Sequence, residues 1–305
     1  MARRSTSRLA LESAAVLCAV LAAAGWVFAR AVYRPPPERA GLSRTASAAV
    51  DEAIVEAVSG SVQRSTSEGD WAALVAGEHL RADDSVRTGK GARTDLRIGD
   101  RARLTVTESS QITIREITDK LHRFQLTRGR VTADYKPDPE RVLRIEGSGG
   151  VVESRGARFS MLSTGTAVAI ATDAGAATLR AQDRAVEVRE GQQAVALQGR
   201  PPSASEPIPA SVLLKVANAA AATDGLCAAV EGLAPPGAEV TVDAATAAVA
   251  ADGRFQVRVP RAGERREVLV ALRDAAGHEE RRKLRCVDPP ARIDDFAIHW
   301  RTRTP

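Results

Sequence analysis

Between residues 94 and 115 the apolar side chains fall on every second position of the chain. They are Leu96, Ile98, Ala102, Leu104, Val106, Ile112 and Ile114. A period of two places side chains alternately on the two faces of an extended strand, so the pattern predicts half-buried strands. Gly99-Asp100 and residues 108–110 interrupt the alternation and are interpreted as tight turns.

Short Val- and Ile-rich runs, each bounded by Gly, Asp or Ser, continue to residue 197. No helical period longer than a turn or two stands out in this stretch, which is typical of an all-β domain. One short helix is predicted before it, near residues 48–58. Its residues Val50, Ile54, Val55 and Val58 would share one helix face.

Glycines and aspartates between residues 77 and 106 could suggest a phosphate or metal loop. A phosphate loop needs G-x-x-x-x-G-K-[ST] leading into a helix, whereas Gly89-Lys90-Gly91 leads into a strand. Asp83-Asp84 lacks the further oxygen ligands of a calcium loop. These residues are interpreted as turn residues, and no metal or cofactor is predicted.

The N-terminus has a different pattern, an uncharged run from Ser13 to Ala29 between arginines. The run approaches the ~20 residues of a membrane-spanning helix. Three interpretations compete: an uncleaved signal anchor, a signal peptide cleaved near Ala31, and a buried helix of a soluble protein. The basic residue inside the possible cleavage site, Arg30, and the aromatic rim of Trp26 and Tyr33 favour the anchor over cleavage, and a buried soluble helix would not need positive flanks. Residues 9–33 are therefore predicted to cross the bacterial inner membrane once. The leader, residues 1–8, is then cytoplasmic and the bulk of the chain periplasmic.

Two proline-rich stretches divide the predicted exterior. Residues 34–50, which contain three consecutive prolines, predict a juxtamembrane stem, and residues 199–222 predict a linker. They delimit a β-domain at residues 51–198 and a smaller β-module at residues 223–288. Residues 289–305 form a C-terminal tail.

Composition and charge limit the classes of partner. Aromatic residues are only 3% of the 305 residues, against 44% hydrophobic residues, so an aliphatic core is predicted. The chain also has few aromatic side chains on which nucleic-acid bases could stack. The net charge of +5 would permit an anionic partner, but the charges are mixed along the chain, as on a solvated surface. No nucleic acid partner is predicted.

A spaced set of residues in the β-domain closely resembles the FecR domain family. The set is Gly60, Ser61, Val62, Trp71, Gly77, Leu80, Asp84, Val86, Arg87, Thr88, Gly89, Gly91, Ala92, Arg93, Leu96, Gly99, Asp100 and Leu104, with the later runs at 126–131, 151–161 and 188–197. Asp83-Asp84 departs from the family's usual Gly-Asp, and Gly156-Ala157 from its Gly-Thr. The resemblance implies a sandwich or solenoid-like domain of two mixed sheets that meets other envelope proteins.

The same resemblance suggests a function. FecR-type regulators of sigma factors carry a cytoplasmic anti-sigma segment. Only about eight residues precede the predicted helix here, so direct binding of a sigma factor is not expected. The chain is predicted to be a membrane-anchored envelope protein that binds a protein or a cell-wall glycan. The alternative is a FecR-type sensor that signals through its membrane helix or through proteolysis.

The smaller module, residues 223–288, shows alternating strands of its own. Pro236-Gly237, Asp252-Gly253 and Asp274 are part of a set that resembles bacterial immunoglobulin-like repeats, which implies a small β-sandwich.

Cysteine usage fits export. Cys227 precedes the first strand of the module and Cys286 ends the last, so a disulfide between them is predicted. Two free buried thiols are the alternative.

Catalytic candidates are few. The four histidines are scattered without a ligand-spaced pair, and no nucleophile motif is present, so neither an enzyme activity nor a small-molecule substrate is predicted. Trp71 is a candidate ligand platform, although a core position is favoured. Arg281 and Arg282 are a candidate polymer-binding patch, although a solvated strand edge is favoured.

The predicted bond between Cys227 and Cys286 would close a loop of about 60 residues, worth roughly 4 kcal/mol in the chain-entropy model. Reduction should therefore lower the melting temperature of the C-terminal unit by many degrees and slow its migration on a non-reducing gel. Two titratable thiols in the folded, exported protein would contradict the bond.

Overall fold

A computed structural model describes residues 52–66, 69–218, 229–243, 245–259 and 267–285. Every described element is a strand, so the predicted all-β class is confirmed. None of these residues belongs to a helix that could span a membrane. The predicted leader, anchor, stem and tail lie outside the described residues. The first residue of the predicted β-domain, residue 51, and the two cysteines Cys227 and Cys286 also lie outside them.

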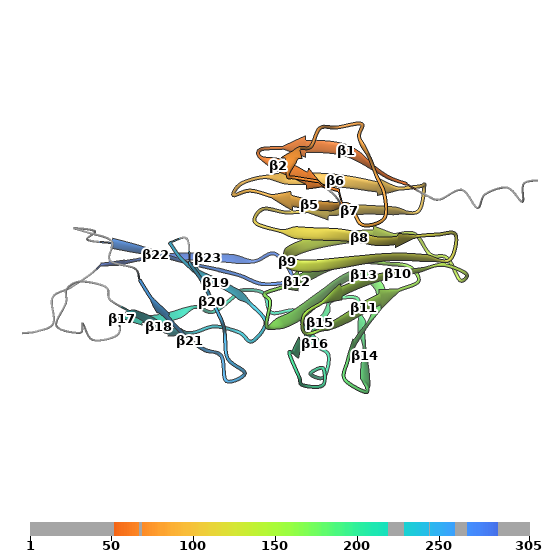
Figure 1. Cartoon of the computed structure of the whole chain (residues 1–305). Coiled ribbons are helices and arrows are strands. Elements are labelled where there is room, and N and C mark those ends of the chain that lie inside the picture. The colour runs from red at the N-terminus through yellow and green to blue at the C-terminus, as the bar shows by residue number, and fades with distance from the viewer. Residues whose placement is uncertain (1–51, 67–68, 219–228, 244, 260–266, 286–305) are drawn as a thin grey trace, which may run out of the picture. The chain divides into compact units, whose positions relative to one another are not determined.

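Sixteen hydrogen-bonded strands form the larger domain and divide into two sheets (Figure 1). In order, the first sheet contains β4 (His79–Leu80), β1 (Ala53–Ser59), β6 (Arg93–Ile98), β7 (Ala102–Val106), part of β9 (Leu121–Tyr135), β12 (Ala157–Ser163), part of β13 (Ala167–Ala181), β15 (Gln192–Leu197) and β16 (Glu206–Pro207). The second contains β3 (Ala72–Ala73), β2 (Val62–Ser65), β5 (Ser85–Thr88), β8 (Gln111–Ile117), part of β9, β10 (Val142–Gly147), β11 (Gly150–Ser154), part of β13 and β14 (Arg184–Arg189). All pairs are antiparallel except β9 with β10, so the second sheet is mixed.

Two long strands, β9 and β13, belong to both sheets. Residues of β9 before Gly129 pair with β8 and β10, and those from Gly129 onwards pair with β7 and β12. Strand β13 changes sheets in the same way after Gly175. Both glycines have positive φ, 88° and 75°, which other residues adopt at a cost.

The core between the sheets matches the alternation in the sequence. Leu96, Ile98, Leu104, Ile112 and Ile114 are fully buried in one apolar cluster that both sheets line. The predicted turns are present, with φ of 55° at both Gly99 and Ser109. Alternate apolar residues therefore determine which face of each strand is inside.

The predicted helix near residues 48–58 is wrong, because β1 is a strand. Ala53 and Val55 are buried and the residues beside them are not, which is the pattern of a strand paired with β6. The pairing register shifts between Val55 and Ala57, and this bulge turns Val58 back toward the core. An extra residue in the strand thus produced the three-residue spacing that resembles a helix face.

Asp83 takes the left-handed conformation, with φ of 69°, at the position where the family pattern has glycine. The next residue, Asp84, is buried and accepts a hydrogen bond from the Arg81 amide at 2.8 Å. Aspartate tolerates this backbone conformation better than most residues. The departure from Gly-Asp therefore keeps the turn.

The C-terminal module consists of two antiparallel sheets around a core that includes Val230, Val240, Phe255, Val270 and Leu272. One sheet contains β17 (Lys215–Asn218), β18 (Ala229–Leu233) and β21 (Arg254–Arg258); the other contains β20 (Ala245–Ala247), β19 (Glu239–Val242), β22 (Glu267–Arg273) and β23 (Glu279–Arg285). The segment predicted as a linker includes β16 and β17.

The corner of β9 gives a test of the fold. A Cβ at Gly129 would collide with the side chain of Ser110, so Gly129→Ala should lower the free energy of unfolding by about 2–4 kcal/mol. Gly191→Ala is the matched control, since Gly191 also has positive φ, 73°, but no atom near its Cβ position. It should cost only about 1 kcal/mol in chemical denaturation. Equal losses would contradict the role of the corner.

Candidate interaction surfaces

Trp71 lies just before β3 and is half-buried. The guanidinium carbon of Arg87 lies 4.1 Å from the centroid of its ring, and Arg87 Nε donates a hydrogen bond to Gln63 Oε1 at 2.7 Å. Gln63 and Arg87 are directly paired on β2 and β5. One face of the indole is therefore covered by a cation, an arrangement that orders the outer surface of the second sheet.

Arg281 and Arg282 lie on β23, which pairs only with β22 among the described strands. Each pairs with a glutamate two residues earlier on its own strand, Arg281 with Glu279 at 2.9 Å and Arg282 with Glu280 at 2.7 Å. Successive residues of a strand point to opposite faces. The structure thus places the two arginines on different faces, each beside a carboxylate.

The described histidines lie in three unrelated surroundings. His79 Nδ1 is 2.7 Å from Glu52, and this hydrogen bond lowers the pKa of the Glu52 carboxyl. His122 is buried with its ring edge-on to Tyr135, and burial raises the pKa of the Tyr135 hydroxyl. His278 lies 2.8 Å from Asp274. Within the described ranges, no three His, Cys, Asp or Glu side chains group as metal ligands.

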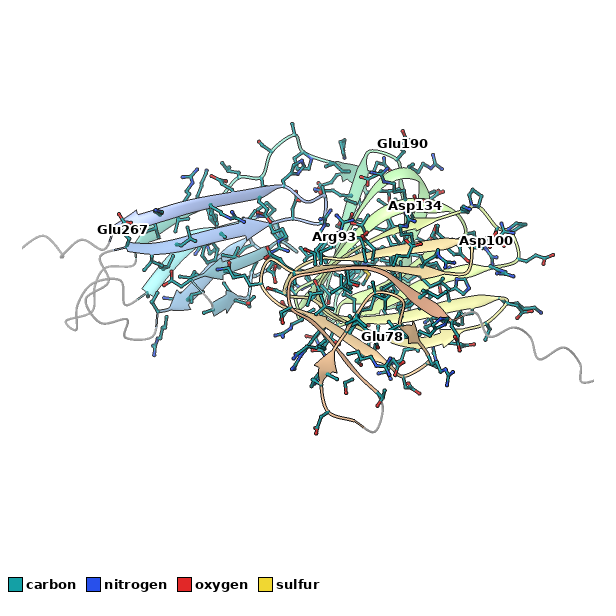
Figure 2. The ribbon with its side chains drawn as sticks, turned by 90° about the horizontal axis from the view of Figure 1, so that it is seen from above. Glu78, Arg93, Asp100, Asp134, Glu190 and Glu267 are labelled. Atoms are coloured by element: carbon teal, nitrogen blue, oxygen red, sulfur yellow. The ribbon has the colours of Figure 1, made fainter. Side chains whose placement is uncertain are left out.

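The last strand of the second sheet, β14, has an open edge. It pairs with β13 over six residues without a register shift, and no described strand pairs with its other side. Glu190, labelled in Figure 2, lies in the turn that follows it. The other edges of the larger domain are shorter or covered: β3 and β4 have two residues each, and the Ser203 hydroxyl and amide bond the backbone of Val195 on β15.

The pairing of β13 with β14 determines which backbone groups face outward. The Glu190 amide donates to the Gly175 carbonyl, and antiparallel pairs alternate between bonded and non-bonded. Val186 and Val188 therefore bond to β13, while the amides and carbonyls of Ala185 and Glu187 point away from it. This edge can accept a strand. Sequence reasoning found the alternation of β14 but could not show that it ends the sheet.

A scan against protein families matches residues 84–192 to the model described as FecR protein. The larger domain is a FecR domain. This confirms the resemblance predicted from the spaced turn and strand residues.

Two crystal structures of a proposed anti-sigma factor from Parabacteroides distasonis ATCC 8503, at 1.65 and 2.50 Å resolution, each give a TM-score of 0.38, at 11% and 10% sequence identity. The aligned region covers 41% of this chain and 60% of each neighbour, so the chain spans less than two thirds of their length. No curated protein matches the chain in sequence.

The Trp71 contact gives a second test. Arg87→Ala removes the cation over the indole and should lower the free energy of unfolding by about 0.5–1 kcal/mol. Arg115→Ala is the matched control, because Arg115 Nε also bonds a glutamine on the neighbouring strand, Gln125, at 2.9 Å. Its further ion pair with Asp83, at 3.3 Å, is exposed to solvent and contributes little to stability. Urea denaturation should show a smaller loss for the control. Equal losses would show that the indole contributes nothing.

Proposed function

We propose that this chain is a non-enzymatic regulatory protein whose FecR domain binds a protein partner in signal transduction. The observation that carries the proposal is the FecR match over residues 84–192. Regulators of this type act through protein contacts. The proposal therefore assigns the binding to the FecR domain, and gives the C-terminal module a supporting role.

The proposed setting is the bacterial envelope. Residues 9–33 would anchor the chain in the inner membrane, with the FecR domain and an immunoglobulin-like C-terminal module in the periplasm, where Cys227 and Cys286 would be bonded. This part of the proposal rests on the sequence: the uncharged run, its arginine flanks and the cysteine positions. Binding outside the membrane would then be passed on through the anchor or through proteolysis.

The proposed binding mode is addition of a partner strand to β14. The backbone groups of Ala185 and Glu187 would supply the hydrogen bonds, and the alternating side chains of the edge would supply selectivity. Backbone pairing depends little on ionic strength, whereas binding of an anionic polymer weakens steeply with salt. A cell-wall glycan is the other candidate partner, and the following experiment separates the two.

Proline at an outward-facing position of β14 tests strand addition. Ala185→Pro and Glu187→Pro each remove one outward amide while leaving the bonds to β13, so capture of the envelope partner should fall about tenfold or more. Glu187→Ala is the matched control: it changes the side chain and keeps the amide. Quantitative affinity capture with the full chain, at low and high salt, measures the effect.

Capture lost in Glu187→Pro and retained in Glu187→Ala, at both salt concentrations, is the expected result. Full capture by both proline variants would refute strand addition at β14. A captured glycan in place of a protein would refute the choice of partner class.

A further inference from the structure

Part of the first sheet is buried on both faces. Six of the seven residues of β12 and the first six of β13 are buried, although a two-layer sandwich buries only one face of each sheet. The outer-face residues Leu162, Ala169 and Ala171 form an apolar cluster with Ala275 of the C-terminal module. Residues 50–305 accordingly group as one compact unit.

The covering element is the loop between β22 and β23, at residues 274–278. Asp274 Oδ1 accepts hydrogen bonds from the amides of Gly277 and His278 at 2.7 and 2.8 Å, and its Oδ2 lies 2.8 Å from His278 Nδ1. The carboxylate thus holds the loop in one conformation. The carbonyls of Ala275 and Ala276 are presented to the FecR domain.

Arg130 of the FecR domain receives these carbonyls. Its Nε donates to the Ala275 carbonyl at 3.0 Å, and its Nη2 donates to the Ala276 carbonyl at 3.3 Å and to Ser160 Oγ at 3.1 Å. Burial, followed by the nearby charge of Arg273, lowers the pKa of Arg130. A partly desolvated guanidinium needs such acceptors, and two of the three come from the other module.

A second arginine crosses the interface in the opposite direction. Arg273 on β22 has a side chain only 16% exposed and contacts Glu108 of the FecR domain at 2.8 Å. Glu279 and Glu239 of its own module lie at 3.4 and 3.9 Å. The Glu239 side chain is only 11% exposed, and this burial raises the pKa of its carboxyl.

Two glycines allow the close approach. A Cβ at Gly277 would lie 2.8 Å from Arg130 Nη2, and a Cβ at Gly237 would lie 2.7 Å from Val195 Cγ1 and 3.2 Å from Ala169 Cβ. Both glycines have positive φ, 97° and 80°. A side chain at Gly237 would collide with packed side chains of the facing sheet, and one at Gly277 would push the Arg130 guanidinium away from its carbonyl partners.

We propose that the C-terminal module is a built-in cover of the FecR domain, docked on the outer face of β12, β13 and β15 by Arg130 and Arg273. The occupant of this apolar face is then the chain's own module, and an external partner has access to it only if the module is displaced. The inference does not depend on partner binding at β14, because its test needs no partner.

Hydrogen–deuterium exchange of the full chain tests the docking. Arg130→Ala and Gly277→Ala should each raise amide exchange about tenfold or more in residues 274–278 and in β12, while β5 and β8 keep their protection. Arg282→Ala is the matched control, since it removes an ion pair within the module. It should change neither region.

A double-mutant cycle on Arg273→Gln and Glu108→Gln gives an independent measurement that leaves Arg130 intact. Docking predicts that the double variant exchanges at residues 274–278 no faster than the single variants. Unchanged exchange there in Arg130→Ala, or additive effects in the cycle, would overturn the proposal. Loss of protection in β5 and β8 would also overturn it, because the side chain would then serve folding of the domain and not docking.

Discussion

The exchange of β9 and β13 between the two sheets is the constraint on which the structure depends. Each strand pairs in one sheet before its glycine corner and in the other sheet after it. The sheets therefore cannot slide past each other without breaking a continuous strand, and their apolar faces are fixed over one core. The register of the outer surfaces, including the open edge of β14, follows from these corners.

The two sheets have different outer surfaces. The second carries ordered polar contacts, such as Arg87 over Trp71, and ends at a strand with free backbone groups. The first is partly apolar and is covered by the loop that Arg130 holds. A partner of the docked chain therefore has the second sheet available, which agrees with the binding proposed for the FecR domain.

Local spacing predicted much of the FecR domain, because alternate burial and turn conformation are local properties. Leu96, Ile98 and Leu104 have their predicted positions, and Asp83 keeps the turn conformation of the glycine it replaces. The helix predicted around Val58 failed because one extra residue in a strand changes the spacing without changing the strand.

The interface could not be predicted in this way. Arg130 bonds carbonyls about 145 residues further along the chain, and no local pattern distinguishes it from a solvated arginine. The sequence analysis did not predict that Arg281 and Arg282 pair with the two preceding glutamates, although alternate residues of a strand share a face and the spacing would have allowed that prediction. The edge position of β14 depends on the topology of the whole sheet.

Site-specific photo-crosslinking in intact cells tests the central claim, that the FecR domain binds a protein through β14. A photoreactive residue at Glu187, whose side chain is 53% exposed, should give a discrete adduct with an envelope protein. The same residue at Arg103 of the first sheet, 61% exposed, should give none. An adduct from position 103 without one from position 187 would contradict the account.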